Sequence, residues 1–206
     1  GAYQPEIGRS GLMSINRRAT RIATLQIAQE HLRRTLSMDP TPLPSNLVAP
    51  EKMSPRELAA LLDDARALKR SAEAGATQPL LRGRRFGLLD AAGDARTDEA
   101  GLFDRAVTEL GAQVAHIRPF LTELSEPQEI ADTAHMLGRL YDAVVCQGMA
   151  PALVRALGAE AGIPVYDGIA SPSHPLAKTA DLLESPTPVS DWRRYLLQAL
   201  LVRQMT

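Results

Sequence analysis

Few residues in this sequence have the types and spacing that chemistry requires. The single cysteine, Cys146, follows an apolar run, and a nucleophilic thiol would need a base, for which His174 is the candidate if both lie at one sheet edge. A buried structural thiol is the simpler interpretation, because such a cysteine behaves as a small apolar residue. One cysteine also excludes an intrachain disulfide and leaves a cysteine-based zinc site without ligands.

The other candidate groups point away from metal and nucleotide chemistry. His31, His116 and His135 lack the spacing of metal ligands, and we interpret each as a surface residue or a hydrogen-bonded core residue. The sequence contains neither a P-loop nor a GxGxxG motif for a dinucleotide. We therefore expect no metal and no cofactor.

Composition narrows the class of protein further. The chain has 206 residues and is 45% hydrophobic, which is enough for a buried core and excludes wholesale disorder. No stretch approaches the roughly 18 apolar residues that span a bilayer, so we expect no membrane segment. The net charge of −1 argues against a general nucleic-acid binder. The charge is uneven, however, with a net +4 in residues 1–36 and a net −5 in the remainder.

The elements that would position these groups alternate between short apolar runs and helices. The expected strands are Phe86–Leu89, Val114–Ile117, Ala143–Cys146 and Ile163–Tyr166. The expected helices cover residues 55–70, 99–110, 127–140, 151–161 and 175–183. This alternation predicts an α/β fold, a three-layer sandwich with a four-stranded parallel sheet. Ligands of such sheets lie beyond the carboxyl ends of the strands, in the loops 90–98, 118–126, 147–150 and 167–174.

Both ends of the chain carry an additional helix. An amphipathic basic helix from about Ser14 to Leu36, followed by a proline-rich linker, forms an N-terminal region of residues 1–50. This helix either packs on the body or a partner, or is a targeting peptide. Ser54 and Glu57 form a capping box for the next helix. At the other end, Ser190 or Asp191 is expected to cap a last helix. Its buried face would hold Trp192, Tyr195, Leu196, Ala199 and Leu200.

Four segments between about residues 51 and 184 resemble the ornithine/aspartate carbamoyltransferase family, closer to its ornithine branch. Residues 81–89, LRGRRFGLL, resemble the first strand of that family, and residues 131–143, ADTAHMLGRLYDA, its "DTARVLGRMYDA" unit. Residues 161–168, AGIPVYDG, resemble "AGVPVWNGL", and residues 174–183 resemble "HPxQxLADLLT". The resemblance implies the fold of the family's N-terminal, carbamoyl-phosphate-binding domain, and a cytoplasmic protein.

The resemblance also implies that a domain is missing. In the family, a second domain of similar size binds the amino-acid substrate. Here only seven residues separate Glu184 from Trp192. Residues 193–201 nevertheless fit the family's C-terminal helix, which returns to the first domain. Residues 51–206 are therefore expected to form one domain, with the substrate domain absent between 184 and 191.

The phosphate loop of the family reads K-x-S-T-R-T-R, in which hydroxyl, N–H and guanidinium groups collect a dianion at a helix N-terminus. The aligned residues 92–98 read AGDARTD, so the site positions are held by Asp94, Ala95, Arg96, Thr97 and Asp98. Only Arg96 and Thr97 match the motif. The carboxylates of Asp94, Asp98 and Glu99 would repel an anion and cap the helix themselves. A retargeted site for a cation or an amine is the alternative.

Two further family positions agree with a degenerate site. Gln147 replaces an arginine that follows the third strand, and Ala177 replaces the glutamine of the "HPxQ" motif. His174 and Pro175 remain, and His174 is either a structural loop residue or a residual ligand contact. Transition-state stabilisation in this family depends on placed positive charge, most of which is absent here.

We therefore predict a catalytically inactive, carbamoyltransferase-like protein with an assembly or regulatory role linked to amino-acid metabolism. The family's carbamoyl-phosphate domains pack around a threefold axis, so the resemblance implies a trimer, or a mixed oligomer with a full-length carbamoyltransferase. No nucleic-acid or membrane partner is expected. Two alternatives stay open: an active half-site within a mixed oligomer, and a sensor of a small ligand, such as an amino acid or polyamine, on the same fold.

Overall fold

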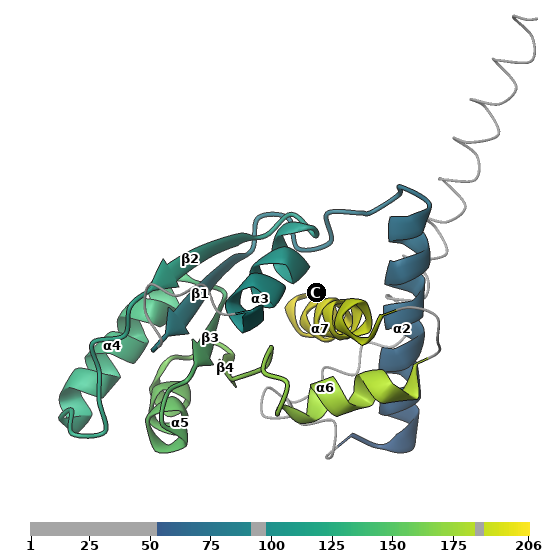
Figure 1. Ribbon diagram of the computed structural model, residues 1–206. Helices are drawn as coiled ribbons and strands as arrows, with labels where there is room; N and C mark the ends of the chain where they lie inside the picture. Colours follow the sequence, from purple (N-terminus) through teal and green to yellow (C-terminus); the bar gives the residue numbers. More distant parts are fainter. Residues whose placement is uncertain (1–52, 92–97, 184–187) are drawn as a thin grey trace, which may run out of the picture.

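A computed structural model describes residues 53–91, 98–183 and 188–206 of the chain (Figure 1). The expected N-terminal helix and most of the proline-rich linker lie outside these residues. The helices are α2 (Pro55–Glu73), α3 (Asp98–Thr108), α4 (Pro127–Leu140), α5 (Pro151–Glu160), α6 (Pro175–Thr179), the 3-10 helix η2 (Ala180–Leu182) and α7 (Val189–Met205). The strands are β1 (Arg85–Asp90), β2 (Gln113–Ile117), β3 (Ala143–Gln147) and β4 (Val165–Asp167). Across the described ranges, no helix combines the length and apolarity that a membrane crossing needs.

The four strands form one parallel sheet in the order β2-β1-β3-β4, which confirms the predicted α/β architecture. Figure 1 shows α4 and α5 on one face of the sheet and α3 on the other. One apolar core lies between the sheet, α3, α2 and α7, and a second lies between the sheet, α4 and α5. Strands β1 and β3, at the centre of the sheet, are buried along nearly their whole length, as their continuous apolar runs require.

The predicted capping box at the start of α2 is confirmed. The Ser54 backbone N–H donates to Glu57 Oε2 at 2.7 Å, and the Glu57 N–H donates to Ser54 Oγ at 3.2 Å. Hydrogen bonds from Ser54 hold the pKa of the Glu57 carboxyl below its usual value. Two N–H groups that lack a partner within the helix are thereby satisfied.

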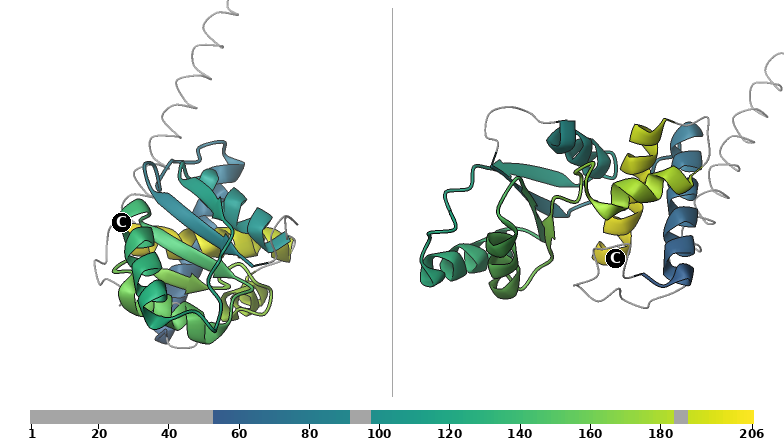
Figure 2. Two further views of the ribbon diagram at one scale, coloured as in Figure 1. Left: turned by 90° about the vertical axis from the view of Figure 1, so that its left-hand side faces the viewer. Right: turned by 60° about the horizontal axis from the view of Figure 1, so that its bottom comes forward.

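The last helix, α7, is enclosed on every side rather than on one face. All five residues of its predicted buried face are buried, and so are Leu197, Leu201, Val202 and Met205. Figure 1 shows α7 nearly end-on between α2 and α3, and the second view of Figure 2 shows it lying alongside α2. A helix that is apolar all round is stable only when it is covered all round. Helix α2 therefore forms an additional outer layer beyond the predicted three.

Several predicted boundaries are wrong, and each has a local cause. Helix α7 is capped by Pro188 without a side-chain hydrogen bond, not by Ser190 or Asp191. Strand β4 begins at Val165, not Ile163, because pairing with β3 starts where Val144 N–H donates to the Pro164 carbonyl. The expected helix 175–183 is divided into α6 and η2.

Polar contacts set how α7 sits between its neighbours. Arg203 forms a hydrogen-bonded ion pair with Asp64 of α2, whose side chain is only 1% exposed. On the opposite side, Gln198 donates to the Ala106 carbonyl of α3 at 2.9 Å and to Glu109 at 3.0 Å. Apolar contacts alone would tolerate sliding of the helix, whereas these buried polar groups must meet particular partners.

Helices α4 and α5 meet at a glycine. A Cβ atom at Gly138 would lie 2.1 Å from the Ala161 carbonyl oxygen, which is far inside van der Waals contact. We expect Gly138→Ala to lower the free energy of unfolding in urea by about 1–3 kcal/mol, because the two helices must separate. The control is Gly158→Ala in α5, where the new Cβ meets Val165 at an ordinary 3.7 Å. A stability loss of equal size in both variants would contradict this interpretation.

The buried pair of Asp64 and Arg203 predicts a pH dependence. Burial raises the pKa of the Asp64 carboxyl above its usual 3.8, although the hydrogen bond from Arg203 opposes the shift. A raised folded-state pKa means that this group stabilises the fold most below pH 3.8, and that the contribution is lost as pH rises through the folded pKa. The free energy of unfolding of the native chain, relative to Asp64→Asn, should therefore fall over that range. Urea titrations at a series of pH values measure this difference, and a rise instead would contradict the assignment.

Candidate functional site

The candidate site lies where β1 and β3 end side by side. After β1 the chain crosses one face of the sheet through α3, and after β3 it crosses the other face through α5. Such a divergence opens a crevice at the carboxyl edge of a parallel sheet, where ligands of these folds bind. Asp90 and Gln147, which are the last residues of the two strands, face each other in the register. The sequence predicted this edge, and the structure confirms its position in the fold.

The crevice contains a carboxylate of the chain itself. Gln147 is only 3% exposed, and its Nε2 donates to Oε2 of Glu99, in the first turn of α3. The other carboxylate oxygen of Glu99 accepts a hydrogen bond from Ser171 Oγ at 3.4 Å. Three segments that are distant in sequence, the start of α3, the end of β3 and the loop after β4, thus converge on one negative charge.

The position of Glu99 suits the local electrostatics. The first turn of a helix carries a partial positive charge, and Asp98 and Glu99 both lie there. The Glu99 carboxylate is therefore stabilised both by the partial positive charge of the helix end and by the hydrogen bond from the Gln147 amide. The same position is the one that favours a phosphate at a helix start, and a carboxylate already present opposes a second anion by Coulomb repulsion.

His174 has a structural partner. Its Nδ1 accepts a hydrogen bond from the Leu176 backbone N–H at 3.1 Å, so that His174 caps α6. Pro175 occupies the first helical turn, and Ala177 is half-buried within this five-residue helix. An acceptor role for Nδ1 places the ring proton on Nε2 when the imidazole is neutral. This hydrogen bond from the Leu176 N–H supports the interpretation of His174 as a structural loop residue.

The remaining site predictions have different outcomes. Asp94, Ala95, Arg96 and Thr97 lie outside the described residues, so their arrangement stays a prediction. Asp98 lies in the wall of a cavity between α3 and α7. Gln147 is brought into contact with Glu99, as described above, whereas Pro175 and Ala177 lie in α6.

Cys146 is unsuited to nucleophilic catalysis. Burial, with a contribution from the charge of Asp167, raises the pKa of the thiol to about 12. The thiol is fully protonated at neutral pH, whereas nucleophilic and metal-binding cysteines act as thiolates. The interpretation of Cys146 as a buried structural residue is confirmed by its complete burial.

His116 and His135 lie beside carboxylates at the surface. His116 Nε2 lies 2.8 Å from Asp104 Oδ2, and His135 Nε2 lies 3.6 Å from Glu160 Oε2. Within the part of the chain that the structure describes, no three histidine, cysteine, aspartate or glutamate residues are grouped so that they could hold a metal ion.

Sequence reasoning did not identify Ser171, nor the contact between Glu99 and Gln147. One signal was available: Gln147 ends a strand that is otherwise apolar and wholly buried, and a buried amide requires a hydrogen-bond partner. Which residue would meet it could not be read from spacing, because Glu99 and Gln147 are 48 positions apart.

A parallel α/β sheet with a helix start facing the β1–β3 crevice defines the class: an open, doubly wound α/β domain, a fold in which ligands bind at this edge of the sheet. Comparison with known proteins then identifies the family. Residues 45–185 match the model of the aspartate/ornithine carbamoyltransferase carbamoyl-phosphate binding domain, and the chain belongs to this family.

Individual relatives agree with this assignment. The chain is 35% identical over 152 residues to a catabolic ornithine carbamoyltransferase of Burkholderia mallei, covering 72% of this chain and 45% of that protein. It is 37% identical over 128 residues to the catabolic enzyme of Haemophilus influenzae, covering 62% of this chain and 38% of the relative. The solved ornithine carbamoyltransferase of Thermus thermophilus superposes with a TM-score of 0.54 at 27% identity, over 68% of this chain and 47% of that one. The chain thus spans less than half the length of these relatives.

The contact between Glu99 and Gln147 predicts that removing Glu99 destabilises the fold more than removing the adjacent Asp98. Glu99→Ala leaves the buried Gln147 amide without its acceptor and should lower the free energy of unfolding by about 1–3 kcal/mol. Asp98→Ala is the control, because Asp98 shares the same helix turn and has no hydrogen bond to a described residue. Urea unfolding measures both variants. An equal loss of unfolding free energy in both variants would show that Glu99 stabilises the fold only through the helix dipole.

Proposed function

We propose that this chain is a carbamoyltransferase-like protein that is not itself catalytic and acts in assembly or regulation linked to amino-acid metabolism. The observation that carries the proposal is the Glu99 carboxylate, held by Gln147 and Ser171 at the start of α3, where we expect the phosphate site of the family. We further propose a cytoplasmic location, following the family.

Electrostatics supports the absence of catalysis. Carbamoyl phosphate carries a dianionic phosphate, which in the family is bound by a loop rich in cations. Here Glu99 adds a negative charge at the start of α3, and Gln147 is neutral where the family pattern has arginine. A dianion would have to approach this carboxylate in a partly desolvated crevice, where like charges repel most strongly.

The connection to α7 supports the loss of the amino-acid domain. Only residues 183–188 join η2 to α7, and α7 packs on α2 and α3 of the same body. The described domain therefore occupies residues 53–206 apart from two short gaps, and we propose that the family's substrate domain is absent between 184 and 191. The coverage of relatives, 38% and 45%, agrees with one domain of the two.

Self-association or association with a full-length relative completes the proposal. The family resemblance implies trimers, whether of this chain alone or mixed with an active carbamoyltransferase. Two large apolar side chains on the loop between β2 and α4, Phe120 and Leu124, are 63% and 93% exposed. Exposed apolar side chains of this size on one loop favour a protein contact.

Calorimetric titration with carbamoyl phosphate tests the loss of catalysis. We expect no heat of binding up to millimolar concentration, because the crevice repels the dianion. A full-length ornithine carbamoyltransferase titrated in parallel is the positive control. Micromolar binding by the native chain would overturn the proposal and favour an active half-site in a mixed oligomer.

Light scattering coupled to size exclusion tests the association. The chain should elute as an oligomer on its own, or should shift to the elution position of the full-length carbamoyltransferase when the two are mixed. If the chain elutes as a monomer in both samples, apart from the full-length enzyme, the assembly role is rejected. A double variant with Phe120→Ser and Leu124→Ser should dissociate. Asp181→Asn, at an exposed position far from the β2–α4 loop, is its control and should remain associated.

A further inference from the structure

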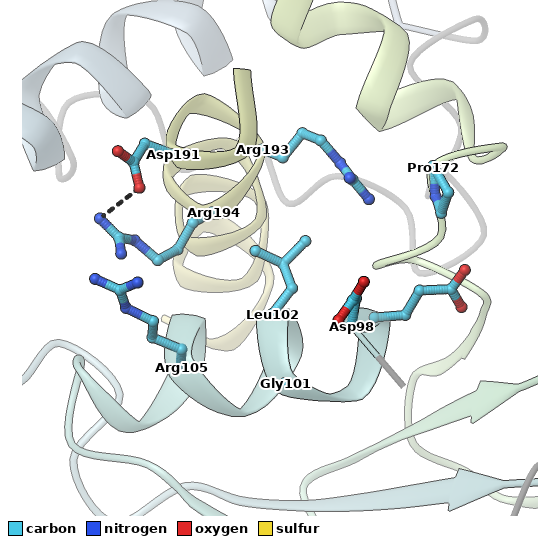
Figure 3. A pocket seen from close by; sticks show the side chains of 9 residues that line it. Asp98, Gly101, Leu102, Arg105, Pro172, Asp191, Arg193 and Arg194 are labelled. Atoms are coloured by element: carbon cyan, nitrogen blue, oxygen red, sulfur yellow. Dashed lines mark ion pairs between the residues drawn. The ribbon is translucent and has the colours of Figure 1, made fainter. Parts of the chain in front are cut away.

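A cavity of about 720 Å³ lies beside the crevice, between the outer face of α3 and the start of α7 (Figure 3). Its volume falls within the usual range of small-molecule sites. The lining carries both signs of charge around one apolar side chain. The residues are Asp98, Glu99, Gly101, Leu102 and Arg105 of α3, Pro172 of the loop after β4, and Asp191, Arg193 and Arg194 of α7.

In one half of the cavity, the charged side chains neutralise one another in ion pairs within the chain. Arg105 Nε donates to Glu109 Oε1 at 3.0 Å, and Arg194 Nε lies 3.4 Å from Glu109 Oε2. Arg194 also lies 3.5 Å from Asp191, the pair that is dashed in Figure 3. Two guanidinium groups and two carboxylates therefore neutralise one another, which leaves no net charge for a ligand at this end.

The other half holds Arg193, Asp98 and Glu99, and of its two carboxylates only Glu99 is hydrogen-bonded to described residues, namely Gln147 and Ser171. Arg193 donates from Nη2 to the Ala170 carbonyl at 2.8 Å, and no carboxylate of the described residues pairs with it. Asp98 has neither a hydrogen bond nor an ion pair with any residue that the structure describes. In Figure 3 the Arg193 side chain extends from α7 toward Pro172, on the side of the cavity where Asp98 lies, and Leu102 projects between the two halves.

We propose that this cavity binds the zwitterionic head group of an aliphatic α-amino acid. The ligand carboxylate would pair with the Arg193 guanidinium, whose planar fork suits two parallel hydrogen bonds. The ligand ammonium would pair with the Asp98 carboxylate, and the aliphatic side chain would pack on Leu102. A ligand with only one charge would leave either Arg193 or Asp98 unpaired in a partly desolvated space.

The cavity adjoins the β1–β3 crevice and shares Glu99 with it. Arg193 and Asp98 line the cavity, whereas Gln147 and Ser171, which hold Glu99, do not. The inference rests on the proposed regulatory role, for which it names a ligand class. It needs no carbamoyl phosphate and no residue donated by another subunit.

Calorimetry with L-leucine tests the inference on the full chain. We expect leucine to bind and its two singly charged analogues, 4-methylpentanoate and 3-methylbutylamine, to bind at least about tenfold more weakly, because each lacks one charge-assisted contact. Equal binding of either analogue would overturn the zwitterion assignment. No heat with leucine at about 10 mM would overturn the site altogether.

Paired variants locate the binding. Arg193→Gln and Asp98→Asn should each weaken leucine binding at least about tenfold. Gly101→Leu should abolish it, because a Cβ at Gly101 meets no atom within 4 Å and a larger side chain would project into open space without disturbing the core. Arg139→Gln and Asp181→Asn, which are exposed and lie outside the cavity, are the charge-matched controls.

The outcomes separate this inference from the proposed function. Urea midpoints close to that of the native chain establish that each variant is folded. Unchanged leucine binding in Asp98→Asn or Gly101→Leu would reject the cavity. Failure of leucine to bind, with a flat carbamoyl-phosphate titration, would remove the amino-acid site and leave the absence of catalysis intact. Binding of carbamoyl phosphate would instead reject the proposed function.

Discussion

The burial of α7 is the constraint on which the rest of the structure depends. Its apolar residues point in all directions, so it is stable only between two covering layers. Helix α2 supplies one of them and has α7 as its main partner, so α2 would lose its support if α7 were removed. Each fully buried leucine of α7 contributes about 1.5–3 kcal/mol, and Leu196, Leu197, Leu200 and Leu201 are all at most 1% exposed.

The same helix determines the geometry of the sites. Gln198 and Arg194 bind α3 through the Ala106 carbonyl and Glu109, and α3 carries Glu99 into the β1–β3 crevice. The start of α7 also forms one wall of the cavity that Arg193 and Asp98 share. The packing of α3 between the sheet and α7 therefore both places Glu99 in the crevice and forms the cavity.

This arrangement bears on how the chain relates to its longer relatives. The described domain is closed by its own C-terminal helix, and its apolar core continues from the sheet through α3 and α7 to α2. A second domain is not needed to cover any part of that core. If the substrate domain is absent, as we propose, the returning helix would still be required, because without it the inner faces of α2 and α3 would be exposed to water.

Much of this protein follows from local sequence. The capping box at Ser54, the α4 boundaries at Pro127 and Leu140, and the order of strands and helices all rest on residues close in the chain, whose preferences depend on near neighbours. The parallel sheet follows from the same alternation. The predictions were weaker at element ends: at β4, at the break between α6 and η2, and at the α7 cap, where tertiary pairing rather than propensity sets the boundary.

Only the tertiary structure decided which distant groups meet. The sequence predicted that carboxylates stand at the start of α3 where the family has cations, and that Gln147 ends a buried strand. It did not show that Glu99 and Gln147 share a hydrogen bond, or that Arg203 reaches Asp64 across 139 positions. Nor did it show that α7 is enclosed on all sides rather than one. Periodicity reports which face of an element is apolar, whereas the partner of each polar group depends on how whole elements pack, and that is set by the sum of contacts across the domain.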